Sequence, residues 1–491
     1  MKPIETLLAT APVHASRFHL LPSEQVPGSG DYILYWMQKA QRSMDNPALD
    51  LAMHLANALE LPLLCVFVLC DYPAAQAPHY RFMLEGLKSC AEDLRSRGAG
   101  FALLQGSPVE QIKALAGQAA VLVADEGKLV FERRWRDELA SSSGRHAMVV
   151  VETESVVPPS AASDRLEWSA ATIRRKIAAL LPFHLPQPSL NAGSPEGATC
   201  CRKAFAGSLG DDSLFSSASA KAGRHTGAAG RGTIEKTRRF GSLLGFQRID
   251  IDSGQLQGLR RFEDFLYSGG LERYGTERND PNAKAGSGMS AYLHFGQLSP
   301  ARLAQKALDH SPSAAQTYVE QLVVRRELAL NYVLHNPGYL EYRSAAPDWA
   351  RRSLASRKFS PRAYSDRELE EGLTDDPYWN AAQKELVLNG AIHTYMRMYW
   401  GKQLLCWFSD PAEAFSVAVQ LNDCYSLDGR DPNGYTGIAW CFGRHDRPWP
   451  ERQGFGKVRA MMASGLRKKF DIHRYAEEME SIYTSRIKET L

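Results

Sequence analysis

Regular cysteine spacings of the kind that mark metal sites or disulfide frameworks are absent from this sequence of 491 residues. Its eight cysteines are scattered, apart from the adjacent Cys200 and Cys201, and they form no CxxC repeat and no Cys/His zinc spacing. The pattern therefore predicts no metal site. Scattered cysteines in a chain of this length also fit a reducing compartment.

Long apolar runs are absent as well. The longest, around Leu61–Leu69, is too short to span a bilayer, so no membrane partner is expected. The N-terminus has no basic region followed by an apolar stretch, and we therefore predict no secretory signal. These observations predict an intracellular protein, cytoplasmic in a prokaryote or nuclear in a eukaryote.

A large net charge is missing too, since 58 Lys and Arg face 55 Asp and Glu, a formal charge of +3. The charge is nevertheless uneven along the chain. Nine Lys and Arg against three Asp and Glu lie from Arg444 to Arg474, and seven against two lie from Arg343 to Arg367. Such basic clusters suit a polyanion, although a solvated basic face explains the charge equally well.

Alternating strand and helix patterns are present in the first part of the chain. Asn46–Glu60 has helical periodicity, with Asp45 or Asn46 as its cap and Pro47 at its first position. The predicted strands are Tyr32–Met37, Leu63–Leu69, Gly100–Leu104, Ala120–Ala124 and Ala147–Glu152. The further predicted helices are Arg81–Arg97, Val109–Ala116 and Phe131–Ser141. This alternation predicts an α/β domain with a doubly wound, parallel, Rossmann-like sheet.

The composition changes after this region. Residues 182–232 are rich in Gly, Ala and Ser, which is typical of a flexible linker or insertion. From Thr233 onward the pattern is mostly helical, with many aromatic residues and arginines. The sequence thus predicts an α/β domain at 1–181, a linker at 182–232 and a large all-helical domain at 233–491.

Three tryptophans, Trp379, Trp400 and Trp407, fall in one stretch of helical character, Asp376–Phe408. The gap of 7 places Trp400 and Trp407 on one helix face, and the gap of 21 from Trp379 is close to six turns of a helix that continues through Gly390. A stripe of core aromatics is the plainer interpretation. The functional interpretation is an electron-transfer chain to a buried redox cofactor. Three tyrosines lie near enough in sequence to contribute, namely Tyr364, Tyr395 and Tyr399.

Turn residues are dense in Leu421–Trp440, which holds three carboxylates, two Asn, three Gly and a Pro. Such a density predicts a loop of fixed shape. Asp428 and Asp431 could each accept a hydrogen bond from Arg397 on the preceding helix. A buried Arg–Asp pair beside a redox cofactor would stabilise charge that develops there. A capped turn between helices, with surface carboxylates, is the alternative.

Phosphate-binding signatures of the GxGxxG and GxxxxGK[ST] types are absent, but Gly286–Gln297 (GSGMSAYLHFGQ) begins with small residues and then becomes helical. Small residues before a helix let backbone N–H groups and hydroxyls approach a phosphate. Taken alone, this stretch is explained as well by a plain helix cap.

Several long motifs, in order, resemble the photolyase/cryptochrome family, and specifically class II cyclobutane pyrimidine dimer photolyases. These motifs are Tyr35–Leu49 (YWMQKAQRSMDNPAL), Arg278–Pro281, Ser290–Ser299 (SAYLHFGQLS), Tyr318–Asn331, Trp379–Trp407, Asp428–Trp440 (DGRDPNGYTGIAW) and Phe470–Tyr475. The resemblance covers nearly the whole chain except the linker. It implies a light-driven lyase that splits pyrimidine dimers in double-stranded DNA by electron transfer from excited reduced FAD. It also implies a monomer without an obligate protein partner.

The resemblance implies a cofactor site in the helical domain. Arg397 and Asp428 would pair beside the flavin ring, and Asn422 would face its N5. The remaining implied cofactor residues are Tyr274, Ser287, Gly288, Met289, Ser290 and Asp431. Electrons would reach the flavin through Trp400, Trp379 and Trp407.

The resemblance also implies a lesion site. Glu320, Met398 and Trp440 would line the dimer pocket, with Trp440 stacking on the bases and Glu320 reading their edges. Arg447 and Arg459 would contact DNA near the lesion. Flipping a locked, poorly paired dimer out of the duplex costs less than flipping normal bases. Phosphate contacts should make binding salt-dependent and largely independent of sequence.

Two features depart from the family pattern. The Gly/Ala/Ser-rich stretch from about Ala192 to Gly232 is longer than the usual link, and the sequence assigns it no role. Val323 and Val324 stand where some members have an aromatic wall, so Trp440 is expected to be the only Trp against the lesion. Family members often carry an antenna chromophore in the N-terminal domain, a deazaflavin or a folate, and the sequence does not decide which, or whether one binds.

Three other functions fit part of the pattern. A cryptochrome-like light receptor would photoreduce FAD and signal; Glu320, Trp440 and the lack of a long tail after the last motif favour repair instead. Repair of the six-four adduct usually calls on histidines, and no His pair stands out near Met398 or Trp440. In a DNA-binding module without catalysis, the tryptophans and Asn422 would only be core and loop residues, and the purified protein would be colourless.

Overall fold

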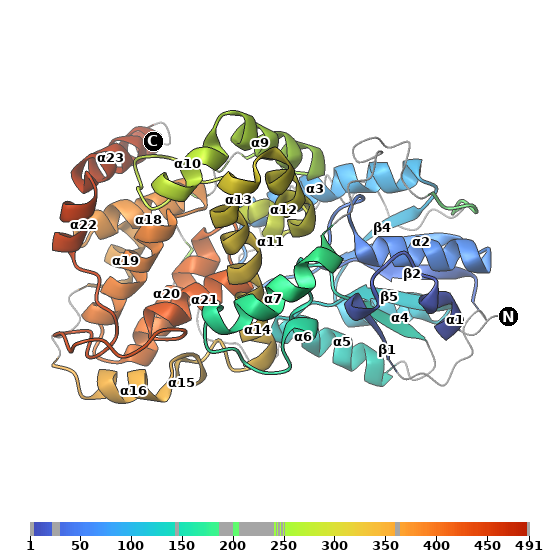
Figure 1. Cartoon of the computed structure of the whole chain (residues 1–491), viewed down its shortest axis with the longest axis horizontal. Coiled ribbons are helices and arrows are strands. Elements are labelled where there is room, and N and C mark those ends of the chain that lie inside the picture. The colour runs from blue at the N-terminus through green and yellow to red at the C-terminus, as the bar shows by residue number, and fades with distance from the viewer. Residues whose placement is uncertain are drawn as a thin grey trace.

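The computed structural model of this chain describes residues 4–21, 30–142, 147–185, 200–205, 251–358 and 364–488, together with 240, 241, 243, 246 and 249. An α/β domain and a helical domain lie side by side (Figure 1), as the sequence predicts. Most of the expected 182–232 linker lies outside the described residues. Helix α7 (Ala170–His184) extends past 181, and residues 200–205 lie against the α/β domain, where Phe205 packs on Tyr32 with ring centroids 6.3 Å apart.

The sheet of the first domain has six strands in the order β1-β6-β5-β2-β3-β4. These strands are β1 (Phe18–Leu21), β2 (Tyr32–Trp36), β3 (Leu63–Leu69), β4 (Gly100–Gln105), β5 (Ala119–Asp125) and β6 (Met148–Val151). All neighbouring pairs are parallel except β1, which runs antiparallel to β6 at the edge. Five of the six strands match sequence predictions, whereas β1 was not predicted.

Helices cover both faces of this sheet. Side chains alternate along each strand, so apolar residues point to both faces and both faces are buried. Ile33 and Tyr35 of β2 belong to the core that includes α2 (Pro47–Leu59) and α3 (Ala77–Ser96). Leu34 and Trp36 belong to the opposite core, with α4 (Pro108–Ala116) and α5 (Val130–Ser142). Both α1 (Ile4–Ala9) and α6 (Pro159–Ala162) are short. The sheet is therefore doubly wound.

Asn46, rather than Asp45, caps α2, with its side-chain oxygen accepting from the N–H groups of Ala48 and Leu49 at 3.1 Å each. Another side-chain acceptor organises the preceding loop. The carboxylate of Asp125, at the end of β5, accepts from the backbone N–H groups of residues 38–40 at 2.7–2.9 Å. The loop after β2 is thereby fixed at the carboxyl end of the sheet.

The second domain is built mainly of helices, with one isolated β-bridge between Arg452 and Gly456 among the residues described. Its first helices are α9 (Gln255–Tyr267), α10 (Gly270–Glu277), α11 (Ser290–His294), α12 (Pro300–His310), α13 (Pro312–Val319), a π-helical turn at Glu320–Arg325 and α14 (Arg326–His335). The later ones are α15 (Tyr342–Ala345), α16 (Asp348–Ala355), α17 (Asp366–Glu371), α18 (Pro377–Asn389), α19 (Thr394–Trp407), α20 (Pro411–Tyr425), α21 (Pro432–Cys441), α22 (Ala463–Lys469) and α23 (Ile472–Lys488). Among the described helices, none has the length and apolarity that crossing a bilayer requires.

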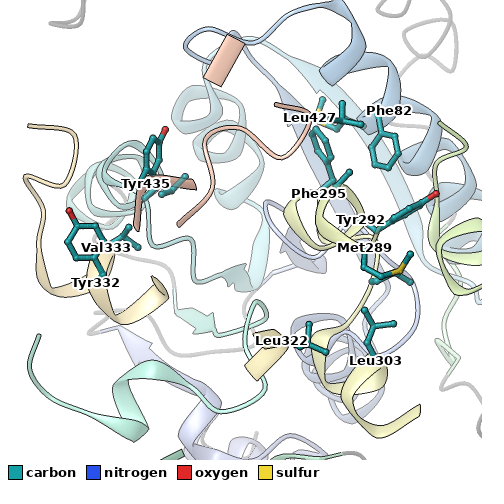
Figure 2. Packing of buried hydrophobic residues seen from close by; sticks show 14 of the residues in the cluster. Phe82, Met289, Tyr292, Phe295, Leu303, Leu322, Tyr332, Val333, Leu427 and Tyr435 are labelled. Atoms are coloured by element: carbon teal, nitrogen blue, oxygen red, sulfur yellow. The ribbon is translucent and has the colours of Figure 1, made fainter. Parts of the chain in front are cut away.

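One continuous core joins the two domains (Figure 2). Phe82 of α3 packs on Tyr292 and Phe295, which belong to α11 and the residue after it, with ring centroids 5.3 and 5.4 Å apart. Polar contacts reinforce this packing, since the buried Arg42 donates to the carbonyl of Gly296 at 2.9 Å. The α/β domain therefore serves as one wall against which the helical domain is positioned.

Candidate functional site

The three tryptophans lie on two helices, which corrects the prediction of one helical stretch. Helix α18 ends before Gly390, whose φ of +62° marks a left-handed C-cap, and α19 begins at Thr394. Trp379 therefore lies on α18, while Trp400 and Trp407 lie on α19. The chain reverses at Gly390, so it is the packing of two helices that brings these side chains together.

The tryptophan rings form a continuous series. The ring centroids of Trp379 and Trp400 lie 6.2 Å apart, with ring planes inclined by 7°. The ring centroid of Trp407 lies 5.1 Å from that of Trp379. Trp379 Nε1 also donates to the carbonyl oxygen of Trp400 at 3.0 Å. Trp407 is half-buried, Trp379 and Trp400 are buried, and Trp379 contacts both of the others, so the series runs from Trp407 through Trp379 to Trp400. Aromatic rings in contact across this depth can pass an electron.

The nearby tyrosines differ in their relation to this series. Tyr364 extends it, because its ring lies 4.9 Å from that of Trp407 and its hydroxyl bonds to Asp375 at 3.3 Å. Tyr399 donates to Asp376 instead, and Tyr395 packs on Phe470.

Arg397, Asn422 and Asp428 converge from α19, α20 and the turn that follows α20. Arg397 Nη1 donates to Asn422 Oδ1 at 2.9 Å, and its Nη2 lies 3.6 Å from Asp428 Oδ1. Ser426 links Arg397 to Asp428, since its hydroxyl accepts from Arg397 at 3.4 Å and donates to Asp428. The predicted arginine–carboxylate pair is thus in place, with a carboxamide beside it.

Asp431 does not pair with Arg397, although the sequence allowed that pairing. It caps α21 through the N–H of Asn433 at 2.8 Å and pairs with His294 Nδ1 at 3.2 Å. Burial would raise the pKa of Asp431, but the His294 hydrogen bond and the charge of Arg326 lower it. Asp431 therefore belongs to a charged cluster at the domain interface, and Asp428 is the partner of Arg397.

The loop before α11 carries the residues implied for phosphate binding. Gly288 has a φ of +70°, and a Cβ there would meet the Arg261 guanidinium at 2.8 Å. The Ser287 hydroxyl lies 3.4 Å from that of Tyr318. Among the described residues, the chain neighbours of Gly286 aside, no atom lies within 4 Å of where a Cβ on Gly286 would be. Backbone, hydroxyl and guanidinium groups therefore meet beside open space.

Contacts connect this loop to the Arg397 cluster. The ring of Tyr318 lies 5.3 Å from that of Tyr274, over which Arg278 lies at 5.9 Å. His393, four residues before Arg397, bonds to the carbonyl of Arg278 at 3.1 Å, and its buried Nδ1 has no partner among the described atoms. The other two predicted loop positions lie within or beside the helix, since Ser290 begins α11 and the Met289 side chain packs in the core near Tyr292 and Leu303 (Figure 2).

Glu320 begins the π-helical turn, a rare form that is often found at functional sites. Arg174 of α7 holds its carboxylate in a fork, with contacts of 3.0 and 2.7 Å, and Arg325 lies 3.3 Å from Oε1. Burial would raise the pKa of Glu320, but the hydrogen bond and charge of Arg174, followed by Arg325, lower it. Val323 and Val324, beside it, are buried.

Two cations lie against the ring of Trp440, another residue of the predicted lesion site. Lys402 Nζ lies 5.0 Å and the Arg459 guanidinium 5.9 Å from its ring centroid. The carbonyl of Met398 accepts from the thiol of Cys441, the residue after Trp440, at 3.7 Å. Arg459 also lies 5.0 Å over Trp449, and Arg447 lies 5.3 Å over the same ring. Aromatic rings and cations thus alternate along this surface, which suits phosphates and bases.

Three of these residues escaped the sequence analysis. Lys402 and Arg174 carry no local pattern, because each acquires its role from a partner far away in the chain. Trp449 lies in the basic segment beside Arg447, and an aromatic among arginines was the signal that could have found it. Among the described residues, no group of three or more His, Cys, Asp or Glu is placed to hold a metal ion.

Comparison with known proteins adds three kinds of similarity. A family model described as DNA photolyase matches residues 33–192. The chain is 40% identical over 473 residues to a deoxyribodipyrimidine photo-lyase of Methanothermobacter thermautotrophicus, covering 96% of this chain and 99% of that protein. It is 37% identical to a protein of the same name from Arabidopsis thaliana, covering 97% and 95%, and 34% identical to one from Potorous tridactylus, covering 91% and 81%.

A solved structure shares the fold. The chain resembles a bacterial class III photolyase from Agrobacterium tumefaciens with a TM-score of 0.62 and 16% identity, over 94% of this chain and 98% of that one. At this identity the likeness concerns the arrangement of both domains and not the chemistry of the site.

Proposed function

This chain belongs to the DNA photolyase family, and we propose that it splits cyclobutane pyrimidine dimers in double-stranded DNA in a light-driven reaction. The observation that carries the proposal is the inner end of the tryptophan series. Trp400 and Arg397 lie one turn apart on α19, so the series ends beside the cluster of Arg397, Asn422 and Asp428. The motifs quoted above support class II within the family.

FAD is the cofactor that fits these residues. The open space at Gly286, the unpartnered His393 Nδ1 and the neighbouring Arg261 and Arg278 suit a dinucleotide with a pyrophosphate. Tyr274, Ser287, Gly288, Met289 and Ser290 would hold its phosphates and sugar, with Met289 offering only its backbone. Arg397, Asn422 and Asp428 would face the flavin ring. When bound and reduced, this cofactor supplies an electron to the dimer on excitation.

The protein's own residues would bind, orient and shield. Arg397 would stabilise negative charge in the ring, with Asp428 and Asn422 fixing its guanidinium. Trp440 would stack on the flipped dimer, with Met398 beside it, and Glu320 would accept hydrogen bonds from the base edges. The series Trp407, Trp379 and Trp400 would bring electrons inward to reduce the cofactor.

DNA binding would rest on the basic surface around Trp440. Arg447 and Arg459, held over Trp449, would contact phosphates near the lesion, so affinity should fall steeply with salt. We propose that the protein acts as a monomer, because one chain supplies each of these groups. We also propose that it acts in the cytoplasm of a prokaryote or the nucleus of a eukaryote.

An antenna chromophore has one candidate site. A cavity beside the 38–41 loop is lined by Gln38, Gln41, Tyr72, Phe131 and His294, and buried polar side-chain atoms of both glutamines have no partner among the described residues. Its volume of about 50 Å³ is too small for a deazaflavin or folate ring unless surrounding side chains move. Reconstitution with each chromophore, followed by excitation spectra of repair, tests this site and identifies its occupant.

One assay tests the main proposal. The purified protein is examined for a flavin spectrum and then illuminated with blue light, reductant and a dimer-containing oligothymidine. Loss of dimer only in the light is the expected result. Photoreduction of flavin without repair would favour a cryptochrome-like receptor, and a colourless protein would leave only a DNA-binding fold. A substrate with six-four adducts serves as the comparison.

A further inference from the structure

Helix α7 of the α/β domain reaches the predicted lesion site in the helical domain. Figure 1 shows α7 beside α13 and α14 at the boundary between the domains. From this helix, Arg174 Nε donates to Glu320 Oε2 at 3.0 Å and Nη2 donates to Oε1 at 2.7 Å. This fork is the geometry in which a guanidinium recognises a carboxylate most specifically.

The fold fixes where Arg174 stands. Before α7, the N–H of Glu167 donates to Asn331 Oδ1 of α14 at 2.9 Å, and the carbonyl of Trp168 accepts from His445 at 2.8 Å. The Glu167 carboxylate also pairs with Lys176, and Lys176 lies on α7 one turn after Ile173. Contacts to α14 and to the loop after α21 therefore hold both the helix and its guanidinium against the π-helical turn.

The pair limits what Glu320 can do. An ionised carboxylate offers about four acceptor positions and no donor. Arg174 occupies two of them, and Arg325 approaches a third at 3.3 Å. The Glu320 side chain keeps 25% of its surface exposed, so one edge stays open to an incoming base. What is left is an ionised acceptor with a fixed direction.

We propose that Arg174 is a positioning residue for dimer recognition, which keeps Glu320 ionised and aimed at the dimer and makes the α/β domain part of the lesion pocket. The inference rests on the proposed function. Arg174 touches neither DNA nor cofactor in this scheme, and it acts only through the Glu320 carboxylate.

Other charged groups around Glu320 are engaged elsewhere. Helix α13 has no charged residue, and on α12 Arg302 pairs with Asp45 and Lys306 with Glu263. On α14 Arg326 donates to the carbonyl of Glu154, and Glu327 accepts from backbone N–H groups of the α/β domain. Arg174 and Arg325 are thus the cations that lower the pKa of Glu320.

The experiment measures light-driven repair by chemically reduced holoenzyme across pH. Arg174→Gln raises the pKa of Glu320 by removing the nearest cation, so the acid limb of the repair profile should move to higher pH. Affinity for dimer-containing oligothymidine should fall about two- to fivefold, as expected for a half-exposed ion pair. Arg174→Lys keeps the charge and should keep the acid limb near that of the wild type. Arg175→Gln, the exposed neighbour on α7, is the matched control and should change neither quantity.

A second set of variants separates positioning from mere packing. In a Glu320→Gln background, Arg174→Gln should add no further loss of affinity, because its partner carboxylate is already gone. An unshifted acid limb, or an equal loss in both backgrounds, would overturn the role of Arg174. Thermal unfolding and the flavin spectrum report whether each variant is folded. Dimer affinity is measured in the dark, so it tests Arg174 even if wild-type protein shows no light-driven repair, the result that would instead sink the proposed function.

Discussion

Lys402 illustrates how single residues acquire a role from their surroundings. It is completely buried, its Nζ donates to the carbonyl of Cys441 at 2.7 Å, and it lies against the ring of Trp440. Burial lowers the pKa of Lys402 to about 8, with Arg459 adding to this effect and Asp446 opposing it. A lysine placed here loses its charge just above neutral pH.

Lys402→Met should therefore remove a pH dependence. In the wild type the ammonium is charged below about pH 8, so its attraction to the Trp440 ring is lost as pH rises through that value. Dimer affinity should fall over the same range, by about two- to tenfold for a partly desolvated cation–π contact. The Met variant should bind weakly at every pH. Lys457→Met, an exposed change in the basic segment, should retain the fall with pH; a similar fall in Lys402→Met would contradict the assignment.

Trp400→Phe tests the inner end of the tryptophan series. Phenylalanine fills most of the buried space but is much harder to oxidise, so photoreduction of oxidised FAD should stop. Repair by enzyme reduced chemically beforehand should persist, because that route needs no electron from the series. Trp135→Phe on α5, remote from α18 and α19, is the control. Photoreduction at the native rate in Trp400→Phe would remove the series from the mechanism.

At the scale of elements, the turn at Gly390 decides the site. The φ of +62° lets α18 end there, and a Cβ would lie 2.7 Å from Ile249 Cδ1 and 3.0 Å from Leu427 Cβ. The N–H of Leu427 also donates to the carbonyl of Gly390 at 2.7 Å, which ties the turn to the end of α20. A continuous helix would have left Trp379 about six turns from Trp400.

Gly390→Ala should accordingly destabilise the protein by about 2 kcal/mol, from left-handed backbone strain and the two close contacts together. Equilibrium unfolding in denaturant measures the change. Gly465→Ala in α22 is the control, since no neighbouring atom of the described structure lies within 4 Å of its new Cβ and the helix should be unchanged or slightly stabilised. Equal stability in both variants would show that the turn tolerates a side chain.

Elements with strong periodicity or unbroken apolar runs were predictable, and those without were not. The run Leu63–Leu69 becomes β3 with the predicted bounds, and Pro47 begins α2 as expected. Strand β1 has only four residues, none of them fully buried, so its sequence shows no distinct pattern. The π-helical turn at Glu320–Arg325 interrupts an ordinary helical pattern, which carries no local signal for the extra residue.

At the scale of the whole molecule, buried polar groups join the two domains. Glu327 of α14 is fully buried, and its Oε1 accepts from the N–H groups of Val156 and Val157 at 2.9 and 2.7 Å. Its Oε2 has no partner among the described atoms. Burial raises the pKa of Glu327 well above its ordinary value. The interface therefore favours the protonated carboxyl.

Glu327→Gln should flatten the dependence of stability on pH. Because the folded protein holds this proton more tightly than the unfolded chain, the contribution of Glu327 is complete below its ordinary pKa and is lost as pH rises through the folded value. Glutamine keeps the acceptor and cannot ionise, so the variant should match the wild type near pH 4, and its melting temperature should exceed that of the wild type increasingly towards pH 9. Glu327→Ala, which orphans two buried N–H groups, should be about 3 kcal/mol less stable than the Gln variant at either pH. A Gln variant with the wild-type pH profile would place the titration elsewhere.

The sequence by itself determined the class of fold, and it supplied the residues that we propose carry the chemistry. Alternating apolar runs and helical periods are local, so they predicted the α/β and helical domains, and motifs quoted in order placed the chain in its family. The tertiary structure decided which residues meet. It selected Asp428 over Asp431 as the partner of Arg397, ordered the tryptophans across two antiparallel helices, and brought Arg174 from the other domain to Glu320. Such contacts depend on where helices end and how they pack, and the spacing of residues along the chain does not encode either directly.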